Sequence, residues 1–332
     1  MANSHVPRKI LLVKTSSLGD VVHNLPLATL LRANFPDAQL DWVVEEAFAD
    51  IPRLHPAIGR VIPVALRRWR RRLHCAATWR EMAAFRRQLR QTAYDLVLDS
   101  QGLIKSGLVV RQALLASGGQ RAGYSAAAAR EPLAAGCYDR RIGVPRQLHA
   151  VARNLRLGAA ACDLSGEQAI DYGIAATPLA APWLPVAPYA LLFTASSRAD
   201  KSWPRQSWLD LATALQANGM TLVLPAGSDA ERLQAGELAA AMGSRATLAP
   251  KLTLAELAGL CAGAQLVVGV DTGLTHLGAA LGRPTLCLFA GSDPALTGVL
   301  AQRASNLGRS GQPPTAAEAN KMVAELLRQG AP

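Results

Sequence analysis

Three segments of the sequence place hydroxyl, acidic and glycine residues where an apolar run gives way to a helical pattern. The first is KTSSLGDVVH, residues 14–23, which follows the apolar run Ile10–Val13. A turn at this point presents free backbone N–H groups, and Gly19 would let a ligand approach the backbone closely. Asp20 would then lie in the first helical turn, with His23 on the same face. Serine and aspartate are also preferred helix caps, so the segment is either the floor of a ligand site or an ordinary capped helix.

The second segment is GVDTGLTHLGAALGRP, residues 269–284, in which an apolar run ends at Asp271. Thr272 and Gly273 follow, and His276 lies in the helical pattern behind them. A hydroxyl, a glycine and the free amides of a helix N-terminus favour phosphate binding. The alternative is that Asp271 caps the helix and His276 is an ordinary helix residue.

The third segment is TASSRADKSWP, residues 194–204. It joins hydroxyls to Arg198 and Lys201, a combination suited to a diphosphate, although the two cations could be ordinary loop charges. Further on, Glu231 follows another apolar run and could accept hydrogen bonds from a ribose diol; an acid in the first turn of a helix is equally expected from the helix dipole. No G-x-G-x-x-G follows the first strand, which argues against a dinucleotide-dependent dehydrogenase.

Excess positive charge is confined to the first half of the chain. Residues 1–170 hold 24 lysines and arginines against 13 acids, whereas residues 171–332 hold 11 of each. Residues 66–90 alone carry nine arginines and a single acid, Glu81. Such a run is usually a solvated face, but so strong an imbalance indicates a polyanionic partner: nucleic acid, an anionic membrane or a phosphorylated glycolipid. Only 5% of the residues are aromatic and no nucleic-acid-binding module is recognisable, so we expect no nucleic-acid partner.

Length and patterning predict an α/β protein with two Rossmann-like domains. In 332 residues, apolar runs alternate with amphipathic stretches in both halves, as in parallel sheets with crossover helices. We predict an N-terminal domain over 1–176, a proline-rich linker over 177–188, a second domain over 189–312, and a last helix in 313–332 that could pack back on the N-terminal domain. The expected strands are Ile10–Val13, Leu40–Val44, Val61–Val64, Leu96–Leu98, Tyr189–Thr194, Thr221–Leu224, Leu266–Val270 and Thr285–Phe289, and the expected helices include Val21–Asn34, Met82–Gln91, Ser207–Asn218, Ala230–Met242, Leu254–Ala262 and one from Leu274.

The sequence also favours a cytoplasmic location. Neither a signal peptide nor an apolar run long enough to cross a bilayer is present. The five cysteines are odd in number, scattered and without a C-x-x-C pair, which indicates reduced thiols and neither disulfides nor a zinc site.

Several segments together resemble the lipopolysaccharide heptosyltransferase I family, within glycosyltransferase family 9. The resemblance runs from about residue 8 to about residue 298 without large insertions. The D-T-G-x-x-H motif at Asp271 is typical of heptosyltransferases in general, while DWVVEE and IPVALRRWR are more specific and favour the first heptose step over later ones. FAGSDP, residues 289–294, departs from the family's usual segment. The matching segments are KTSSLGDVVHNLP, DWVVEE, VIPVALRRWR, DSQGLIKSG, AREPLA, ADKSWP and VDTGLTHLGAALGRP.

The resemblance implies a GT-B fold, in which two Rossmann-like domains with parallel sheets face each other across a cleft. It implies inverting transfer of L-glycero-D-manno-heptose from ADP-heptose to Kdo-lipid A, with Asp20 as general base ahead of His23 and without a metal or other cofactor. Asp271 would face the heptose and orient it or steady a developing positive charge. The donor would contact Ser196, Ser197, Lys201, Glu231, Asp271, Thr272, Gly273 and His276, and the acceptor would contact Ser17, Gly19, Arg67, Arg68, Arg70, Arg71, Gln101 and Arg130.

The implied acceptor carries Kdo carboxylates and lipid A phosphates, and these negative charges would explain the excess of basic residues in the first half of the chain. We therefore expect peripheral association with the anionic cytoplasmic face of the inner membrane. The alternatives are a transferase for a later core heptose or another nucleotide sugar, and a non-enzymatic protein that binds nucleotides or nucleic acid.

Overall fold

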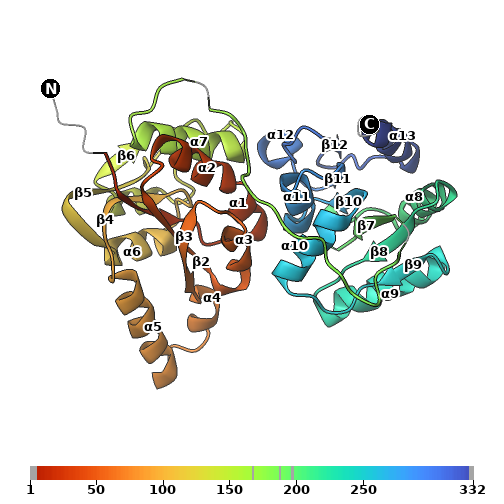
Figure 1. Cartoon of the computed structure of the whole chain (residues 1–332), viewed down its shortest axis with the longest axis horizontal. Coiled ribbons are helices and arrows are strands. Elements are labelled where there is room, and N and C mark those ends of the chain that lie inside the picture. Colours follow the sequence, from red (N-terminus) through yellow and green to blue (C-terminus); the bar gives the residue numbers. More distant parts are fainter. Residues whose placement is uncertain (1–5, 167, 187, 196–197, 329–332) are drawn as a thin grey trace. The chain divides into compact units, whose positions relative to one another are not determined.

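The computed structural model describes residues 6–166, 168–186, 188–195 and 198–328. The chain divides into two compact units, Met1–Ile174 and Ala175–Pro332 (Figure 1). Each unit contains a six-stranded, all-parallel sheet with helices on both faces. The prediction of two Rossmann-like α/β domains is thus confirmed.

The first unit has the strand order of a dinucleotide-binding fold, with the order reversing between β1 and β4. Buried apolar residues make up nearly all of β1, as expected for a strand covered on both faces. In spatial order the strands are β3 (Ile58–Val64), β2 (Gln39–Glu45), β1 (Lys9–Val13), β4 (Ala93–Asp99), β5 (Leu114–Tyr124) and β6 (Arg140–Ile142). The helices are α1 (Leu18–Val22), α2 (Leu25–Asn34), η1 (Glu46–Phe48), α3 (Asp50–Arg53), α4 (Leu66–Trp69), α5 (Ala76–Leu89), α6 (Ile104–Gln112), η2 (Pro132–Cys137) and α7 (Ala150–Ala161).

One predicted helix of this unit is two helices. The stretch Val21–Asn34 is interrupted after Val22, and α2 begins at Leu25 with Pro26 in its first turn. Proline fits the start of a helix, where its missing N–H has no partner to lose. The short α1 therefore belongs to the loop after β1, and this division places Asp20 beside the end of the strand.

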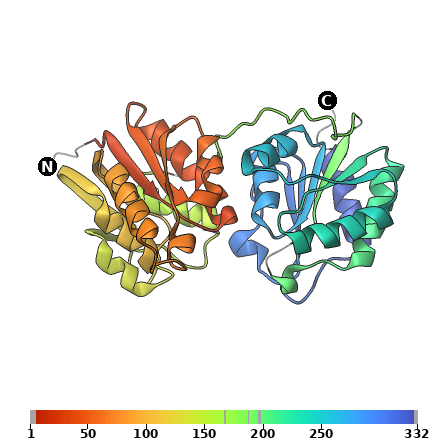
Figure 2. The same cartoon turned by 90° about the horizontal axis from the view of Figure 1, so that it is seen from below.

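The second unit repeats the same topology. Its order again reverses in the middle, between β7 and β10. Figure 2 shows both units from below. The strands in spatial order are β9 (Ala246–Leu248), β8 (Thr221–Leu224), β7 (Tyr189–Phe193), β10 (Leu266–Val270), β11 (Thr285–Phe289) and β12 (Ala304–Gly308). The helices are η3 (Ala199–Lys201), α8 (Arg205–Ala217), α9 (Asp229–Met242), α10 (Leu254–Gly263), α11 (Gly273–Ala280), α12 (Pro294–Thr297) and α13 (Ala316–Arg328).

Two segments of the second unit pack on the core of that unit. The C-terminal helix α13 packs within its own unit: its apolar side, with Val323 and Leu326, is buried against α8 and the β11–β12 edge. The proline-rich segment over 177–188 is not a free linker along its described part. Leu179 and Trp183 pack on the core beneath α10, and the Leu179 N–H donates to the Gly259 carbonyl at 3.0 Å. Burial of apolar side chains explains both placements.

Small residues allow α11 to lie close against β10. Gly269 faces the Thr275 side chain, and a Cβ at Gly278 would lie 2.9 Å from a methyl group of Val267, so larger residues would push the helix away. The Thr275 hydroxyl also donates to the Val270 carbonyl at 2.8 Å. This packing fixes the turn that holds Asp271.

Candidate functional site

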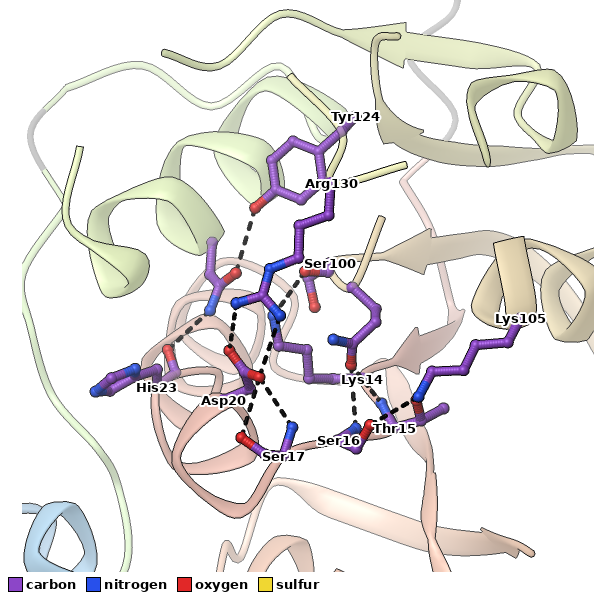
Figure 3. A network of polar contacts seen from close by, with 12 residues as sticks. Lys14, Thr15, Ser16, Ser17, Asp20, His23, Ser100, Lys105, Tyr124 and Arg130 are labelled. Atoms are coloured by element: carbon purple, nitrogen blue, oxygen red, sulfur yellow. Dashed lines mark hydrogen bonds and ion pairs between the residues drawn. The ribbon is translucent and has the colours of Figure 1, made fainter. Parts of the chain in front are cut away.

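The loop after β1 holds the Asp20 carboxylate in a defined position. Its Oδ2 accepts hydrogen bonds from the Ser17 N–H at 2.9 Å and from the Ser17 hydroxyl at 3.2 Å, in the capping arrangement that the sequence left open (Figure 3). The Arg130 guanidinium, from the loop after β5, lies 3.3 Å from Oδ1. The Asp20 side chain keeps 15% of its surface exposed, so a substrate can still reach it. Capping and a chemical role are therefore compatible here.

Charge around Asp20 keeps it ionised. Burial opposes ionisation, but the charges of Lys14 and Arg130 and the hydrogen bonds from Ser17 outweigh it, so the pKa of Asp20 lies below its usual value. Lys14 is itself buried at the end of β1, and its ammonium group donates to the Ser100 carbonyl at 2.7 Å. Burial lowers the pKa of Lys14 to about 8, although Asp20 acts in the opposite direction.

Gln101 connects the ends of β1 and β4. Its Oε1 accepts from the N–H groups of Thr15 and Ser16 at 3.0 and 3.1 Å. The buried Asp99 holds the Gln101 N–H at 2.7 Å and so fixes this second loop. Among the described residues the Gln101 Nε2 has no hydrogen-bond partner, although Gln101 is only 3% exposed. The two loops thus form one rigid wall at the point where the strand order reverses.

A small pocket of about 30 Å³ lies between this wall and α7. The predicted residues Asp20, Gln101 and Arg130 meet there. Ser17 and Gly19 lie on the same loop as Asp20. The pocket also contains residues that we did not select from the sequence: Lys14, Ser100, Tyr124, Ala150, Arg153 and Asn154.

The predicted preference for Asp20 over His23 as base agrees with the orientation of the two side chains. The His23 ring is 3% exposed and packs edge-to-face against His149 at 5.5 Å. Figure 3 shows it directed away from the Asp20 carboxylate. His23 therefore contributes to the contact between α1 and α7.

The four predicted acceptor arginines gather on α4 and the turn behind it, but they are not equally available. Arg68 is held by two acids, Glu46 at 3.0 Å and Glu81 at 2.7 Å. The Arg67 guanidinium lies over the Phe48 ring, 5.1 Å from its centre. Arg70 and Arg71 are exposed. Two acids, Glu46 and Glu81, therefore neutralise part of the basic segment 66–90, in which the sequence shows Glu81 alone. The other arginine side chains of the turn after α4 and of α5 are exposed to solvent.

The second unit gathers its predicted residues at the corresponding place. Asp271 follows β10 and is 8% exposed; its Oδ2 accepts from the Lys201 ammonium at 2.6 Å and from the Ser292 hydroxyl, and its Oδ1 lies 3.2 Å from the His276 Nε2. Burial opposes ionisation, but the hydrogen bonds from His276, Lys201 and Ser292 hold the pKa of Asp271 well below its usual range. Ser292 was missed from the sequence; the only hint was that its segment, FAGSDP, departs from the family pattern.

Thr272 occupies the N-cap position of α11 without a capping hydrogen bond from its side chain, and Gly273 is the first residue of the helix, so free N–H groups lie next to the Lys201–Asp271 pair. Glu231 lies at the start of α9 and accepts from the N–H groups of Ser228 and Gly227 at 2.8 and 3.2 Å. The capping alternative therefore holds for Glu231, which also lines a cavity of about 230 Å³ with Thr194 and Trp203. Ser196 and Ser197 lie outside the described residues.

Comparisons with known proteins identify the family of this chain. The family model described as "Glycosyltransferase family 9 (heptosyltransferase)" matches residues 82–324. Lipopolysaccharide heptosyltransferase 1 of Pseudomonas aeruginosa is 44% identical over 90% of this chain and 83% of its own length. The enzyme of the same name from Escherichia coli K12 is 42% identical over 87% of this chain and 90% of its own length.

Solved structures agree with the sequence relatives. The E. coli heptosyltransferase WaaC with ADP is similar with a TM-score of 0.86 and 38% identity, covering 96% of this chain and 99% of that chain. The same enzyme with ADP-2-deoxy-2-fluoro heptose gives a TM-score of 0.82 at 37% identity, covering 97% and 100% of the two chains. With two parallel-sheet domains and a polar cluster where each sheet reverses its order, the chain belongs to glycosyltransferase family 9, the heptosyltransferases.

Proposed function

We propose that this protein transfers L-glycero-D-manno-heptose from ADP-heptose to the Kdo of Kdo-lipid A, with inversion at the anomeric carbon. One observation carries the proposal. An ionised carboxylate lies at the strand reversal of the first sheet, and a lysine–aspartate pair lies beside the start of a helix at the strand reversal of the second. Ligands of open α/β sheets bind at such points. The names of the relatives support the choice of heptose as the sugar and lipopolysaccharide as the product.

In the first step Asp20 accepts the proton of the Kdo hydroxyl as that oxygen attacks the anomeric carbon. The two hydrogen bonds from Ser17 fix the carboxylate, and its lowered pKa keeps it ionised at neutral pH. A positioned general base contributes about 10²–10⁴-fold to a rate. The bond from the anomeric carbon to the β-phosphate oxygen breaks, and ADP leaves with its negative charge.

The second unit receives that charge. Lys201 supplies an ammonium group, while Thr272 and Gly273 offer a hydroxyl and backbone N–H groups. Ser196 and Ser197 supply hydroxyl groups from the segment TASSRADKSWP, which also contains Lys201. Glu231 contacts the ribose, and Asp271, steadied by His276, faces the heptose. These cationic and backbone groups stabilise the leaving diphosphate, so the scheme contains no metal step.

The basic surface binds the rest of the acceptor. Arg67, Arg70 and Arg71 meet the lipid A phosphates, and Arg68, which Glu46 and Glu81 hold, lies beside them. The exposed arginines of α5 face an anionic membrane leaflet. Among the described residues, no helix is both long and apolar enough to cross a bilayer. We therefore propose peripheral attachment to the cytoplasmic face of the inner membrane, with no nucleic-acid partner.

The test is product analysis after mixing the protein with ADP-heptose and Kdo-lipid A. We expect ADP and a lipid whose mass has increased by one heptose unit, with the α-anomer formed if the donor is the β-anomer. Core already carrying the first heptose serves as the competing acceptor. Transfer to that core, with none to Kdo-lipid A, would replace this proposal with a later heptose step.

A further inference from the structure

The pocket beside Asp20 contains more hydrogen-bond donors than acceptors. Lys14, Arg130 and Arg153 bring three cationic groups to it, and Asp20 is its single carboxylate among the described residues. The acceptor atoms available nearby are already occupied: the Ser100 carbonyl by Lys14, and the Asn154 Oδ1 by the Tyr124 hydroxyl at 3.3 Å. The pocket is therefore built for an anion.

Two buried donors of this pocket lack partners within the described part of the chain. Gln101 lines the pocket and is only 3% exposed, and its Nε2 makes no hydrogen bond. The Arg153 Nε is likewise unsatisfied, while its guanidinium stacks 4.9 Å from the centre of the Tyr124 ring. A buried donor without a partner costs about 1–3 kcal/mol, so such groups are expected where a ligand completes them.

We propose that this pocket takes the carboxylate of the acceptor sugar and that its entry draws Arg130 away from Asp20. The inference rests on the proposed function, because Kdo is an acidic sugar and a heptose is neutral. The volume of about 30 Å³ suits the two oxygens of a carboxylate, since one water-sized probe needs about 10–15 Å³. Lys14 and Gln101 bind the anion from the wall, and Arg130 closes over it from the opposite side.

Arg130 is free enough to move. Its contacts with the two Asp20 oxygens are long, 3.3 and 3.5 Å, and its side chain is 50% exposed. Exposed pairs of this kind contribute at most about 1 kcal/mol. If the guanidinium moves from Asp20 to the carboxylate of the sugar, one ion pair replaces another. A bidentate contact with the sugar carboxylate is stronger than the long contacts with Asp20.

The exchange turns Asp20 from a neutralised carboxylate into a base. In the ligand-free protein Arg130 occupies both carboxylate oxygens and helps to lower the proton affinity of Asp20. When the acceptor removes Arg130, one oxygen becomes available to the Kdo hydroxyl and the proton affinity rises, which favours proton transfer. A neutral acceptor would leave the arginine in place. The pocket therefore makes the anionic sugar a condition for activity as well as a point of attachment.

The test compares two soluble acceptors, a Kdo glycoside and the same glycoside with its carboxylate converted to the carboxamide. In the wild type we expect kcat/KM for the carboxamide to be at least about 100-fold lower, from the loss of one two-pronged charged contact and of base release. In Arg130→Gln the two acceptors should differ by less than about tenfold, and the carboxamide should react at least as fast as with the wild type. Gln101→Leu should raise KM for the carboxylate more than for the carboxamide.

Arg111→Gln is the matched control, because Arg111 is an exposed arginine of the same unit outside the pocket, and it should keep the wild-type ratio. A wild-type ratio below about three would overturn the inference while leaving the proposed function intact. An unchanged ratio in both Arg130→Gln and Gln101→Leu would overturn it as well. Absence of heptose transfer to Kdo-lipid A itself would instead refute the proposed function.

Discussion

Replacing Asp20 with asparagine should separate catalysis from folding and from donor binding. Asparagine keeps the shape of the side chain, and its carbonyl oxygen can still accept the hydrogen bonds from the Ser17 N–H and hydroxyl. What is lost is the negative charge and the ability to take up a proton. The substitution therefore keeps the contacts with Ser17 and removes the proposed proton acceptor, together with the charge that faces Arg130 and Lys14.

The magnitudes follow from the contacts. The broken ion pair joins Asp20 to a half-exposed Arg130 at 3.3 Å and contributes about 1 kcal/mol to the free energy of unfolding; the loss of negative charge beside the buried Lys14 adds to this cost. Loss of a general base should lower kcat by about 10²–10⁴-fold. That range corresponds to about 3–5 kcal/mol in the activation free energy, since each tenfold change is 1.36 kcal/mol. The effect on rate should thus be several times the effect on stability.

The assay is ADP release with Kdo-lipid A as acceptor, together with calorimetric titration of ADP. The affinity for ADP should be unchanged, because Lys201 and Glu231 belong to the other unit. Asp163→Asn is the matched control: Asp163 is exposed and also pairs with an arginine, Arg140, and its substitution should leave kcat within twofold. A kcat for Asp20→Asn within tenfold of the wild type, or a parallel loss of ADP affinity, would refute the assignment of Asp20 as base.

Three further outcomes are expected. Lys201→Met should weaken ADP binding about 10–100-fold in calorimetry, from the loss of one charge-assisted hydrogen bond; unchanged affinity would place the diphosphate elsewhere. Burial lowers the pKa of Lys14 to about 8; Asp20 and Asp99 raise this pKa, whereas Arg130 and Arg153 lower it. We therefore expect kcat/KM for the acceptor to decline above about pH 8, as the ammonium group loses its proton. A flat pH profile up to about pH 9.5 would contradict this expectation. Burial lowers the pKa of His55 to about 4, so on acidification the unfolded chain takes up a proton at this residue before the folded chain does. The free energy of unfolding should therefore fall by up to about 3 kcal/mol as the pH drops from about 6.5 to 4. Urea titrations should show this fall in the wild type and a smaller one in His55→Gln, and the pH dependence of the two proteins should agree above about pH 7.

Strands that consist of a contiguous apolar run could be predicted from the sequence. Apolar runs such as Ile10–Val13 and Leu266–Val270 are strands within one residue of their predicted bounds. β5 was not predicted, because its sequence, LLASGGQRAGY, mixes glycine and polar residues in a strand that is buried only at its end. Hydrophobic periodicity carries no signal in such a strand.

The site was predictable where a motif is contiguous and not where it depends on pairing between distant strands. Asp20 and Asp271 stand in recognisable turns. Lys14 and Gln101 meet because β1 pairs with β4, and no spacing in the sequence reveals that their side chains share a pocket. Ser292 reaches Asp271 from the loop after β11 in the same way. Tertiary contact, which single-sequence patterns do not encode, accounts for these omissions.

The docking of Leu179 and Trp183 onto the core beneath α10 changes where the C-terminal half should be cut for study in isolation. A fragment starting at Tyr189, the first residue of β7, would lose these side chains and expose the apolar surface that they cover. A fragment starting at Ala175 would keep both side chains on the apolar surface that they cover, and it should therefore express in a better-folded form.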